Sequence, residues 1–316
     1  MTPRLVVTPG DPRGVGPEVT ARALERFVEE QAGADVCIVG PEGPLGVGAL
    51  AELAEEARAA DGTLDSAMAG SVAARSIEYA VRLAMDGRAH AIVTAPLHKP
   101  SLHAAGWEVP GQTEMLAELS GAPRVGMLMA AERTRLGAPL RVLLATTHLS
   151  LRQAVDAVTS EVLVNQIELL HEALATDWGF AEPRIGVCAM NPHASDGGLF
   201  GDEEALVYAP ALAEVRARGI RATGPLPADT VFSRALAGAF DAVVAPYHDV
   251  GMAAFKTVSF GAGVNVTLGL PFPRTSPDHG TAFDLAGLDR ADPRSTVEAL
   301  RLATRLARAR DSTRAL

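Results

Sequence analysis

The stretch RLVVTPGDPRGVGPEVTARALERFVEE, residues 4–30, sets the expectation for the whole fold. RLVVTPG is an apolar run typical of a buried strand, and PEVTARALERFVEE has the period of a helix that opens at Pro17, a tolerated first-turn position. The glycines between the two runs let the backbone turn tightly and approach a ligand closely. A strand that leads through a short turn into a helix is the repeating unit of an α/β protein.

The same alternation of apolar runs and helical segments continues along the chain. Further strands are expected at DVCIVG, AIVTAP, RVLLATTH, RIGVCAM and AVVAPY. Further helices are expected at residues 71–85 with Ser71 as the cap, from about Ser150 to Leu174, around residues 202–219 and at residues 294–310. This alternation predicts mostly parallel sheets with right-handed crossovers, in a bilobal α/β protein with a cleft.

Composition bounds the class of protein. A chain of 316 residues with 48% apolar and 21% charged side chains suits a soluble globular protein of one large or two smaller domains. The net charge of -10 is spread along the chain, whereas nucleic-acid or anionic-membrane binding needs a basic face. The amino terminus is too quickly interrupted to be a signal peptide, and no apolar run reaches the roughly 18 residues of a membrane helix. We therefore expect a cytoplasmic protein that binds neither nucleic acid nor membrane.

Three histidines each follow an apolar, strand-like run. They are His148 after RVLLATT, His193 after RIGVCAMNP and His248 after AVVAPY. Open α/β sheets bind ligands at the carboxyl ends of their strands, and three neutral imidazoles suit a zinc-like metal with one open coordination position. A single histidine in such a place is more readily explained as structural, satisfied by backbone hydrogen bonds. Three in equivalent positions favour a shared site.

The scarcity of lysine is a second signal. Of 28 Lys and Arg side chains only Lys99 and Lys256 are lysines, which leaves 26 arginines. Lys99 closes TAPLHK, directly after an expected strand, and Lys256 follows His248 by two helical turns. An ammonium is a compact point charge, so both lysines are candidates for a site, Lys256 the stronger. The stretch from Lys256 to Gly287 gathers further polar residues among glycines and indicates a lined pocket.

Eight motifs taken together resemble the 4-hydroxythreonine-4-phosphate dehydrogenase family. They are TPGDPRGVGPE, TAPLHK, GQTE, TTHLSL, NPHASDGGLFG, YHDVG, GVNVTLGLP and RTSPDHGTAFDLAG, in family order over nearly the whole chain. Two of them also resemble the isocitrate and isopropylmalate dehydrogenase superfamily. The resemblance implies a two-domain α/β/α fold. Residues 1–125 and 255–316 would form the domain with both termini, and residues 126–254 the domain with the metal-ligand histidines and dimer contacts.

The resemblance also implies a homodimer whose active site lies at the subunit interface. His148, His193 and His248 would bind a divalent metal there, with ligands from both subunits. Zinc suits three imidazoles best, with magnesium or cobalt as alternatives. The implied catalytic residues are Lys256, Asp229 and Asp249. The two aspartates would orient the metal ligands. The positions implied to bind substrate are Gln112, Thr113, Lys256, Asn265 and Arg274. NAD, with NADP as the alternative, would lie along His279, Gly280, Thr281 and Asp284.

Family members oxidise the secondary alcohol of 4-phosphooxy-L-threonine with NAD. The 3-oxo acid then loses carbon dioxide to give 3-amino-2-oxopropyl phosphate, which feeds pyridoxal phosphate synthesis. This chain departs from the family pattern at Gln112, usually histidine, and at Val250, usually glutamine. Erythronate or threonate 4-phosphate therefore stays open as the substrate, while Thr113, Glu114 and Lys256 favour some phosphorylated acid. An acyl transferase on a related scaffold and a metal-bound sensor without catalysis are two further hypotheses, and the three histidines argue against the first.

Overall fold

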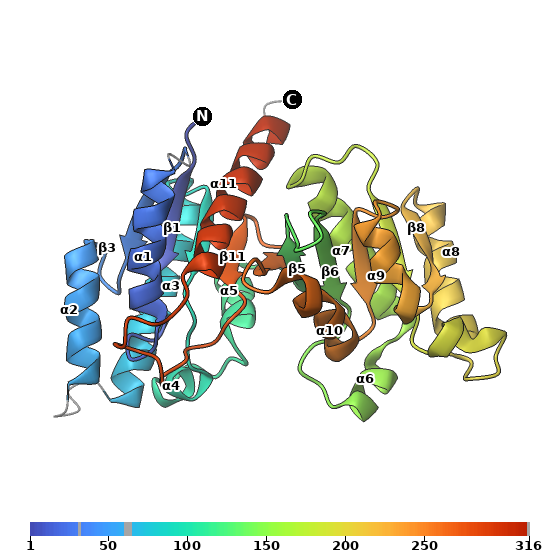
Figure 1. Cartoon of the computed structure of the whole chain (residues 1–316), viewed down its shortest axis with the longest axis horizontal. Coiled ribbons are helices and arrows are strands. Elements are labelled where there is room, and N and C mark those ends of the chain that lie inside the picture. Colours follow the sequence, from blue (N-terminus) through green and yellow to red (C-terminus); the bar gives the residue numbers. More distant parts are fainter. Residues whose placement is uncertain (31–32, 60–64, 315–316) are drawn as a thin grey trace. The chain divides into compact units, whose positions relative to one another are not determined.

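The computed structural model describes residues 1–30, 33–59 and 65–314, which form two compact units (Figure 1). Unit 1 comprises residues 1–125 and 269–316, and unit 2 comprises residues 126–268. Residues 255–268, which the sequence assigns to the first domain, lie in unit 2. They do so because they complete a helix and an antiparallel strand of that unit.

The strands of unit 1 lie in the order β3-β2-β1-β4-β11. Strand β1 is parallel to β2 and β4, β4 is parallel to β11, and the short β3 is antiparallel to β2. All of β4 and all of β1 except Arg4 are buried, as in parallel sheets that helices cover on both faces. The bounds are β1 (Arg4–Thr8), β2 (Asp35–Val39), β3 (Pro44–Leu45), β4 (Ala91–Thr94) and β11 (Arg274–Pro277).

Helices pack on the strands of unit 1 in two groups. Helix α11 packs on β1, β4 and β11 and against α1, while α3 packs on β1, β2 and β4 and against α4 and α5. The core under α3 includes Ile77, Ile92 and Leu102, and Trp107 packs against it. The helices are α1 (Gly16–Glu29), α2 (Val47–Arg58), α3 (Ser66–Met85), α4 (Lys99–Ala104), α5 (Gln112–Ser120) and α11 (Arg294–Arg314).

The strands of unit 2 lie in the order β10-β5-β6-β9-β7-β8. Strands β6, β9, β7 and β8 are parallel neighbours, and β5 runs antiparallel to both β6 and β10. The bounds are β5 (Gly126–Ala131), β6 (Leu140–Leu144), β7 (Arg184–Cys188), β8 (Arg221–Leu226), β9 (Ala242–Ala245) and β10 (Val264–Leu268).

The helices of unit 2 close a second core, which includes Val142, Phe232, Val243 and Phe255. Their bounds are α6 (Leu151–Ala157), α7 (Ser160–Thr176), α8 (Ala209–Ala217), α9 (Ala228–Leu236) and α10 (His248–Ser259), with the short turns η1 (Pro192–Asp196) and η2 (Glu204–Tyr208).

A charged group is buried in unit 2 beside a tryptophan. The Arg141 guanidinium donates to both carboxylate oxygens of Glu132, at 3.1 and 2.7 Å. The indole Nε1 of Trp178 donates to Glu132 at 3.0 Å, and the guanidinium lies 5.6 Å from its ring centroid. The pair is therefore neutralised and hydrogen-bonded, as a buried charge requires.

The predicted α/β class with mostly parallel sheets is confirmed, and each expected strand is present. Five further strands, β3, β5, β8, β10 and β11, were not anticipated from the sequence. Helix α3 begins at Ser66 rather than Ser71, because the Asp65 carboxylate accepts from the Met68 amide at 2.8 Å and caps the helix earlier. The helix expected from Ser150 to Leu174 is two helices, α6 and α7, since Thr159 caps a new start.

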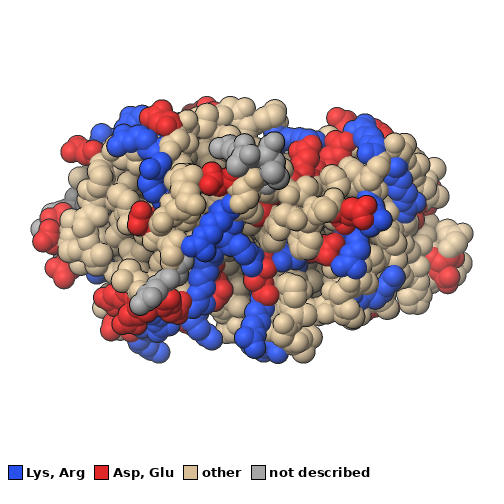
Figure 2. Space-filling view, turned by 90° about the horizontal axis from the view of Figure 1, so that it is seen from above, with Lys and Arg blue, Asp and Glu red and all other residues tan. Residues whose placement is uncertain are grey.

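Acidic and basic side chains are interspersed on the face shown in Figure 2. Among the described residues, none of the helices combines the length and apolar character needed to cross a membrane.

Candidate active site

The three histidines lie at one edge of the sheet in unit 2. Strands β6, β9 and β7 are parallel neighbours, so their carboxyl ends share this edge. His148 follows β6, His248 is the first residue of α10 after β9, and His193 lies in η1 after β7. The sheet order thus places all three where open α/β sheets bind ligands.

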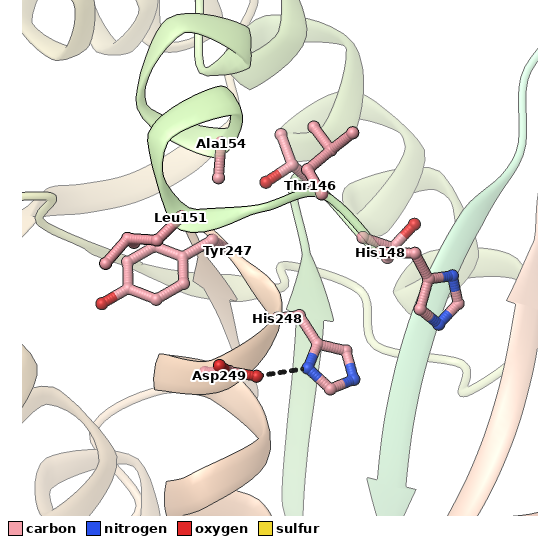
Figure 3. A pocket seen from close by; sticks show the side chains of 9 residues that line it. Thr146, His148, Leu151, Ala154, Tyr247, His248 and Asp249 are labelled. Atoms are coloured by element: carbon pink, nitrogen blue, oxygen red, sulfur yellow. Dashed lines mark hydrogen bonds and ion pairs between the residues drawn. The ribbon is translucent and has the colours of Figure 1, made fainter.

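His148 and His248 share a pocket of about 220 Å³. Their ring centroids are 5.7 Å apart, and Figure 3 shows the two imidazoles side by side. His148 has a φ of +53°, in the left-handed region that side chains other than glycine seldom adopt, so the backbone is held in an unusual conformation here. The other lining residues are Thr146, Thr147, Leu149, Leu151, Ala154, Tyr247 and Asp249.

The hydrogen bond at His248 fixes which ring nitrogen is available. Its Nδ1 lies 2.7 Å from the Asp249 carboxylate, which can only accept when ionised, so Nδ1 carries the proton. The Nε2 atom then keeps its lone pair, and in Figure 3 it points away from Asp249. A histidine that binds a metal through one ring nitrogen commonly donates a hydrogen bond from its other ring nitrogen to a carboxylate.

His193 stands apart from this pair. It is exposed, its ring is 6.4 Å from that of Phe200, and it does not line the pocket. Across the described part of the chain, no three His, Cys, Asp or Glu side chains are placed to hold one metal ion. Within a single chain the structure therefore brings together two of the three predicted ligands.

A buried carboxylate holds the backbone around His193. Residues 193–196 all have positive φ, between +45° and +69°. Glu204, 6% exposed, accepts from the Met190 amide at 2.9 Å, the Asn191 amide at 2.7 Å, the Asn191 side chain at 2.9 Å and the Ser195 hydroxyl. Burial acts to raise the pKa of Glu204, but the hydrogen bonds from Ser195 and Asn191 together lower it below its ordinary value. This acid was not anticipated, although the acidic run DEE, residues 202–204, directly follows the quoted motif NPHASDGGLFG.

The other predicted residues of unit 2 lie outside the pocket. Asp229 is exposed in the first turn of α9, the helix that packs against η1 and hence near the His193 turn. Lys256 is exposed on α10, two turns beyond His248. Asn265 lies in β10, and within the described residues its buried Oδ1 has no hydrogen-bond partner. A buried acceptor of this kind is suited to a ligand that donates a hydrogen bond.

Two of the predicted substrate-binding residues of unit 1 are in direct contact. The Arg274 guanidinium, at the start of β11, donates to the Gln112 Oε1 at 2.7 Å and to the Thr94 hydroxyl at 2.6 Å. Arg274 is 3% exposed, and burial lowers its pKa to about 10, so it is still charged at neutral pH. Thr113 is half-buried in the first turn of α5, next to Gln112.

The predicted cofactor segment lies against the glycine-rich loop of residues 8–18. The Val15 amide donates to the Thr281 carbonyl at 2.9 Å, and a Cβ added to Gly14 would lie 2.7 Å from the same oxygen. His279 pairs its Nδ1 with the Gly280 carbonyl at 3.0 Å, while its Nε2 is buried and, among the described residues, unpartnered. Gly280 and Asp284 are exposed.

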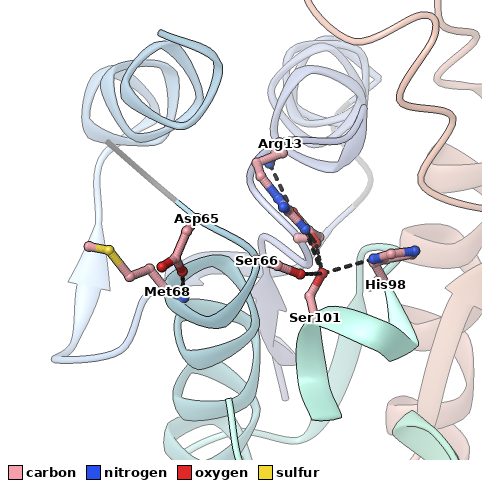
Figure 4. A network of polar contacts seen from close by, with 7 residues as sticks. Arg13, Asp65, Ser66, Met68, His98 and Ser101 are labelled. Carbon is pink, nitrogen blue, oxygen red and sulfur yellow. Dashed lines mark hydrogen bonds and ion pairs between the residues drawn. The ribbon is translucent and has the colours of Figure 1, made fainter. Parts of the chain in front are cut away.

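A polar network inside this loop was missed by the sequence analysis. Asp11, fully buried, accepts from the Arg13 guanidinium at 2.9 and 3.1 Å and from the Ser101 hydroxyl at 2.9 Å. Figure 4 shows the Ser101 hydroxyl at the junction of Arg13, Ser66 and His98. The network joins the loop of residues 8–18 to the segment after β4. An acid and an arginine two residues apart within GDPRG were the available signal.

Comparison with known proteins identifies the family of this chain. The family model "Pyridoxal phosphate biosynthetic protein PdxA" matches residues 33–303. A 4-hydroxythreonine-4-phosphate dehydrogenase of Beijerinckia indica is 44% identical over 96% of this chain and 94% of its own. A D-threonate 4-phosphate dehydrogenase of Cupriavidus necator is 43% identical over 96% of this chain and 97% of its own.

Solved structures extend the likeness to the fold. The crystal structure of a 4-hydroxythreonine-4-phosphate dehydrogenase from Klebsiella pneumoniae has a TM-score of 0.80 and 35% identity, over 97% of this chain and 98% of that one. An isocitrate dehydrogenase from Methylococcus capsulatus, at 14% identity and a TM-score of 0.51, shares the fold alone, over 99% of this chain and 88% of that one. With the sequence matches, these likenesses show that the chain belongs to the PdxA family of pyridoxal phosphate biosynthetic proteins.

Proposed function

We propose that this protein oxidises 4-phosphooxy-L-threonine with NAD and a divalent metal, in pyridoxal 5'-phosphate biosynthesis. The observation that carries the proposal is the His148–His248 pair, set in a pocket at the carboxyl ends of parallel strands with Asp249 on the remote nitrogen of His248. Family membership and the names of relatives that align along nearly their whole length support the same activity.

The reaction is an alcohol oxidation followed by a decarboxylation. The carbon bearing the secondary hydroxyl gives a hydride to NAD⁺, and the hydroxyl gives up its proton to a base. The resulting 3-oxo acid breaks its bond to the carboxylate and releases carbon dioxide. The carbon left behind takes up a proton, which gives 3-amino-2-oxopropyl phosphate. Lys256 is the proposed proton donor. Asp229 and Asp249 are proposed to orient the metal ligands.

The donor set fits a divalent metal. Two imidazoles on one tetrahedral zinc, at Zn–N distances of about 2 Å, have ring centroids roughly 5 to 6 Å apart, and the observed separation is 5.7 Å. Zinc is the proposed ion, with magnesium or cobalt as alternatives. When bound, the metal lowers the pKa of the substrate hydroxyl. His148 and His248 would hold it from one protomer and His193 of the partner subunit from the other.

Exposed apolar side chains support this homodimer. Leu149, Leu151 and Val155 are exposed beside His148, and Leu199, Phe200 and Leu206 are exposed beyond His193. Clusters of exposed large apolar side chains mark interaction surfaces. Contact between the first cluster of one protomer and the second cluster of another would bring His193 to the incomplete histidine pair and bury both clusters.

The remaining roles follow from charge and position. Arg274 and Lys256 supply the positive charges for the carboxylate and phosphate of the substrate, with Gln112, Thr113 and Asn265 as further binding residues. NAD, or NADP as the alternative, would bind along His279, Gly280, Thr281 and Asp284. The exposed Asp284 is a suitable partner for a ribose hydroxyl. The proposed location is the cytoplasm.

A second candidate substrate is D-threonate 4-phosphate, the substrate in the name of the Cupriavidus necator relative. The observation that favours it is Gln112. A neutral amide stands where the family usually has histidine, so the charge presented to the substrate differs.

The test is the formation of NADH, followed by absorbance, with zinc, magnesium or cobalt added. 4-Phosphooxy-L-threonine is compared with the 4-phosphates of D-threonate and erythronate. We expect turnover of the threonine phosphate, loss of it in His193→Ala and His248→Ala, and its retention in His171→Ala, a histidine on α7 away from the site. Turnover of the sugar-acid phosphates without turnover of the threonine phosphate would establish the second candidate. Full activity of His248→Ala would refute the metal site.

A further inference from the structure

A series of hydrogen bonds connects the backbone directly after β4 to the buried arginine at the start of β11. The Gln112 Nε2 donates to the Ala95 carbonyl at 3.0 Å, and its Oε1 accepts from the Arg274 guanidinium at 2.7 Å. The Thr94 hydroxyl, one residue before Ala95, accepts from the same guanidinium at 2.6 and 3.2 Å. Gln112 thus joins the first turn of α5 to two strands of unit 1.

The two partners of Gln112 leave its amide a single orientation. Reversing the amide would set its oxygen against the Ala95 carbonyl and its NH₂ group against the guanidinium, and both contacts would be repulsive. Because Ala95 is a backbone acceptor next to β4, the amide is anchored to the sheet itself. The position of the Oε1 atom, and hence of its partner on Arg274, is fixed by the fold.

The two acceptors described above for the Arg274 guanidinium, Thr94 and Gln112, are neutral side chains. A buried guanidinium is costly unless its N–H groups are hydrogen-bonded. Thr94 and Gln112 provide such bonds without cancelling the charge, whereas a carboxylate in the place of Gln112 would neutralise it. Burial lowers the pKa of Arg274 to about 10 and the nearby charge of Glu114 acts to raise it, so the guanidinium that Gln112 contacts is charged at neutral pH.

We propose that Gln112 is also a positioning residue, which acts on the substrate through Arg274. Its oxygen holds the guanidinium in the direction that the anionic group of the substrate requires, and its neutral amide adds no negative charge beside the guanidinium. The choice of substrate here rests on the proposed function.

Three variants separate positioning from simple stability. Gln112→Met keeps the length of the side chain and removes both hydrogen bonds. Gln112→Glu keeps an acceptor for Arg274 and adds a negative charge. Gln166→Met is the matched control, because the Gln166 Oε1 is buried with no hydrogen-bond partner among the described residues, in α7 of unit 2.

We expect the KM for the phosphorylated acid to rise about tenfold or more in Gln112→Met, the usual effect of losing a hydrogen bond to a charged group. It should rise further in Gln112→Glu. The KM for NAD should not change, and kcat should change much less than KM. Gln166→Met should match the wild type. A KM for the acid in Gln112→Met within twofold of wild type would overturn the proposal.

Crystal structures of the wild type and Gln112→Met give a readout that needs no turnover. The guanidinium of Arg274 should leave its position beside Thr94 in the variant, and an unmoved guanidinium would also overturn the proposal. If the wild type oxidises none of the acids offered, the proposed function fails, and these two structures still decide whether Gln112 positions Arg274. If Gln112→Met does not fold, the same comparison is made with Gln112→Glu, in which the guanidinium should turn toward the new carboxylate.

Discussion

At the scale of single residues, backbone conformation explains why the loop of residues 8–18 has its glycines. Gly10 has a φ of +70°, and a Cβ at this position would lie 2.1 Å from the Pro96 carbonyl oxygen. The next amide, of Asp11, donates to that same oxygen at 3.0 Å. The close approach is what places the Asp11 carboxylate within reach of Ser101. Glycine is therefore required at position 10 for two reasons, the positive φ and the lack of space for a Cβ atom.

Replacing Gly10 by alanine should show both requirements. We expect Gly10→Ala to lower the free energy of unfolding by about 3 kcal/mol or more, the strain of a positive φ plus the displacement of Pro96. Unfolding in urea, followed by circular dichroism, measures it. Gly87→Ala is the matched control, because Gly87 has a φ of +69° with open space around its Cβ position. Its cost should be about 1 kcal/mol. Equal costs in the two variants would show that the contact with Pro96 is unimportant.

At the scale of elements, the sequence predicts those strands and helices that are marked by a regular pattern of apolar residues. The strands that precede the three histidines are correctly placed, and so is the fold class, because continuous apolar runs between helices are typical of buried parallel strands. Strand β5, GMLMAA, was missed since methionine and alanine have little preference for strands. Strand β11, RTSP, was missed since its buried residues are polar and are held by partners far along the chain, such as Thr94 for Arg274.

The site shows the same division. Among the residues named from the sequence, the structure brings His148 beside His248 and Gln112 into contact with Arg274. The sequence cannot reveal that residues 193–196 turn in the left-handed region, because nothing in the letters PHASD favours a positive φ as a glycine would. That conformation is held by Glu204, which lies nine residues beyond Ser195 and accepts hydrogen bonds from Ser195 and Asn191.

The Glu204 anchor leads to a prediction about pH. We expect Glu204→Gln to lower the free energy of unfolding at pH 7 by about 1 to 3 kcal/mol, because an NH₂ group would then face donors. The folded-state pKa of Glu204 is lowered, so its contribution is present above the unfolded pKa of about 4.3 and is lost as the pH falls through the folded value. The gap between variant and wild type should therefore narrow below about pH 4.

Urea titrations from pH 7 to pH 3 test this. Glu161→Gln, an exposed acid in the first turn of α7, serves as the control and should cost less than about 0.5 kcal/mol at every pH. A gap between Glu204→Gln and wild type that stays constant down to pH 3 would contradict the assigned role of the carboxylate.

At the scale of the whole molecule, one chain brings together two of the three histidines of the proposed metal site. The pair at His148 and His248 and the turn at His193 lie at the ends of different strands of one unit. Each is accompanied by exposed apolar side chains. The proposed site shared between two copies would account for both observations and would make the activity depend on dimerisation.

Mixing two inactive variants tests the shared site. His193→Ala and His248→Ala, unfolded together and refolded at equal amounts, should regain about one quarter of wild-type activity. Half of the dimers would then be mixed, and each mixed dimer would contain one complete site. A mixture as inactive as its components would show that no site is shared. Refolding each variant with wild type in equal amounts controls for losses during the procedure.

The placement of the two tryptophans gives each unit its own optical reporter. Trp107 packs against the core of unit 1, and Trp178 lies beside the Arg141–Glu132 pair of unit 2, and the chain contains no other tryptophan. The intrinsic fluorescence of a variant that keeps only one of them would follow the melting of a single unit. The chain thus carries a natural means of asking whether its two halves lose their structure together or one after the other.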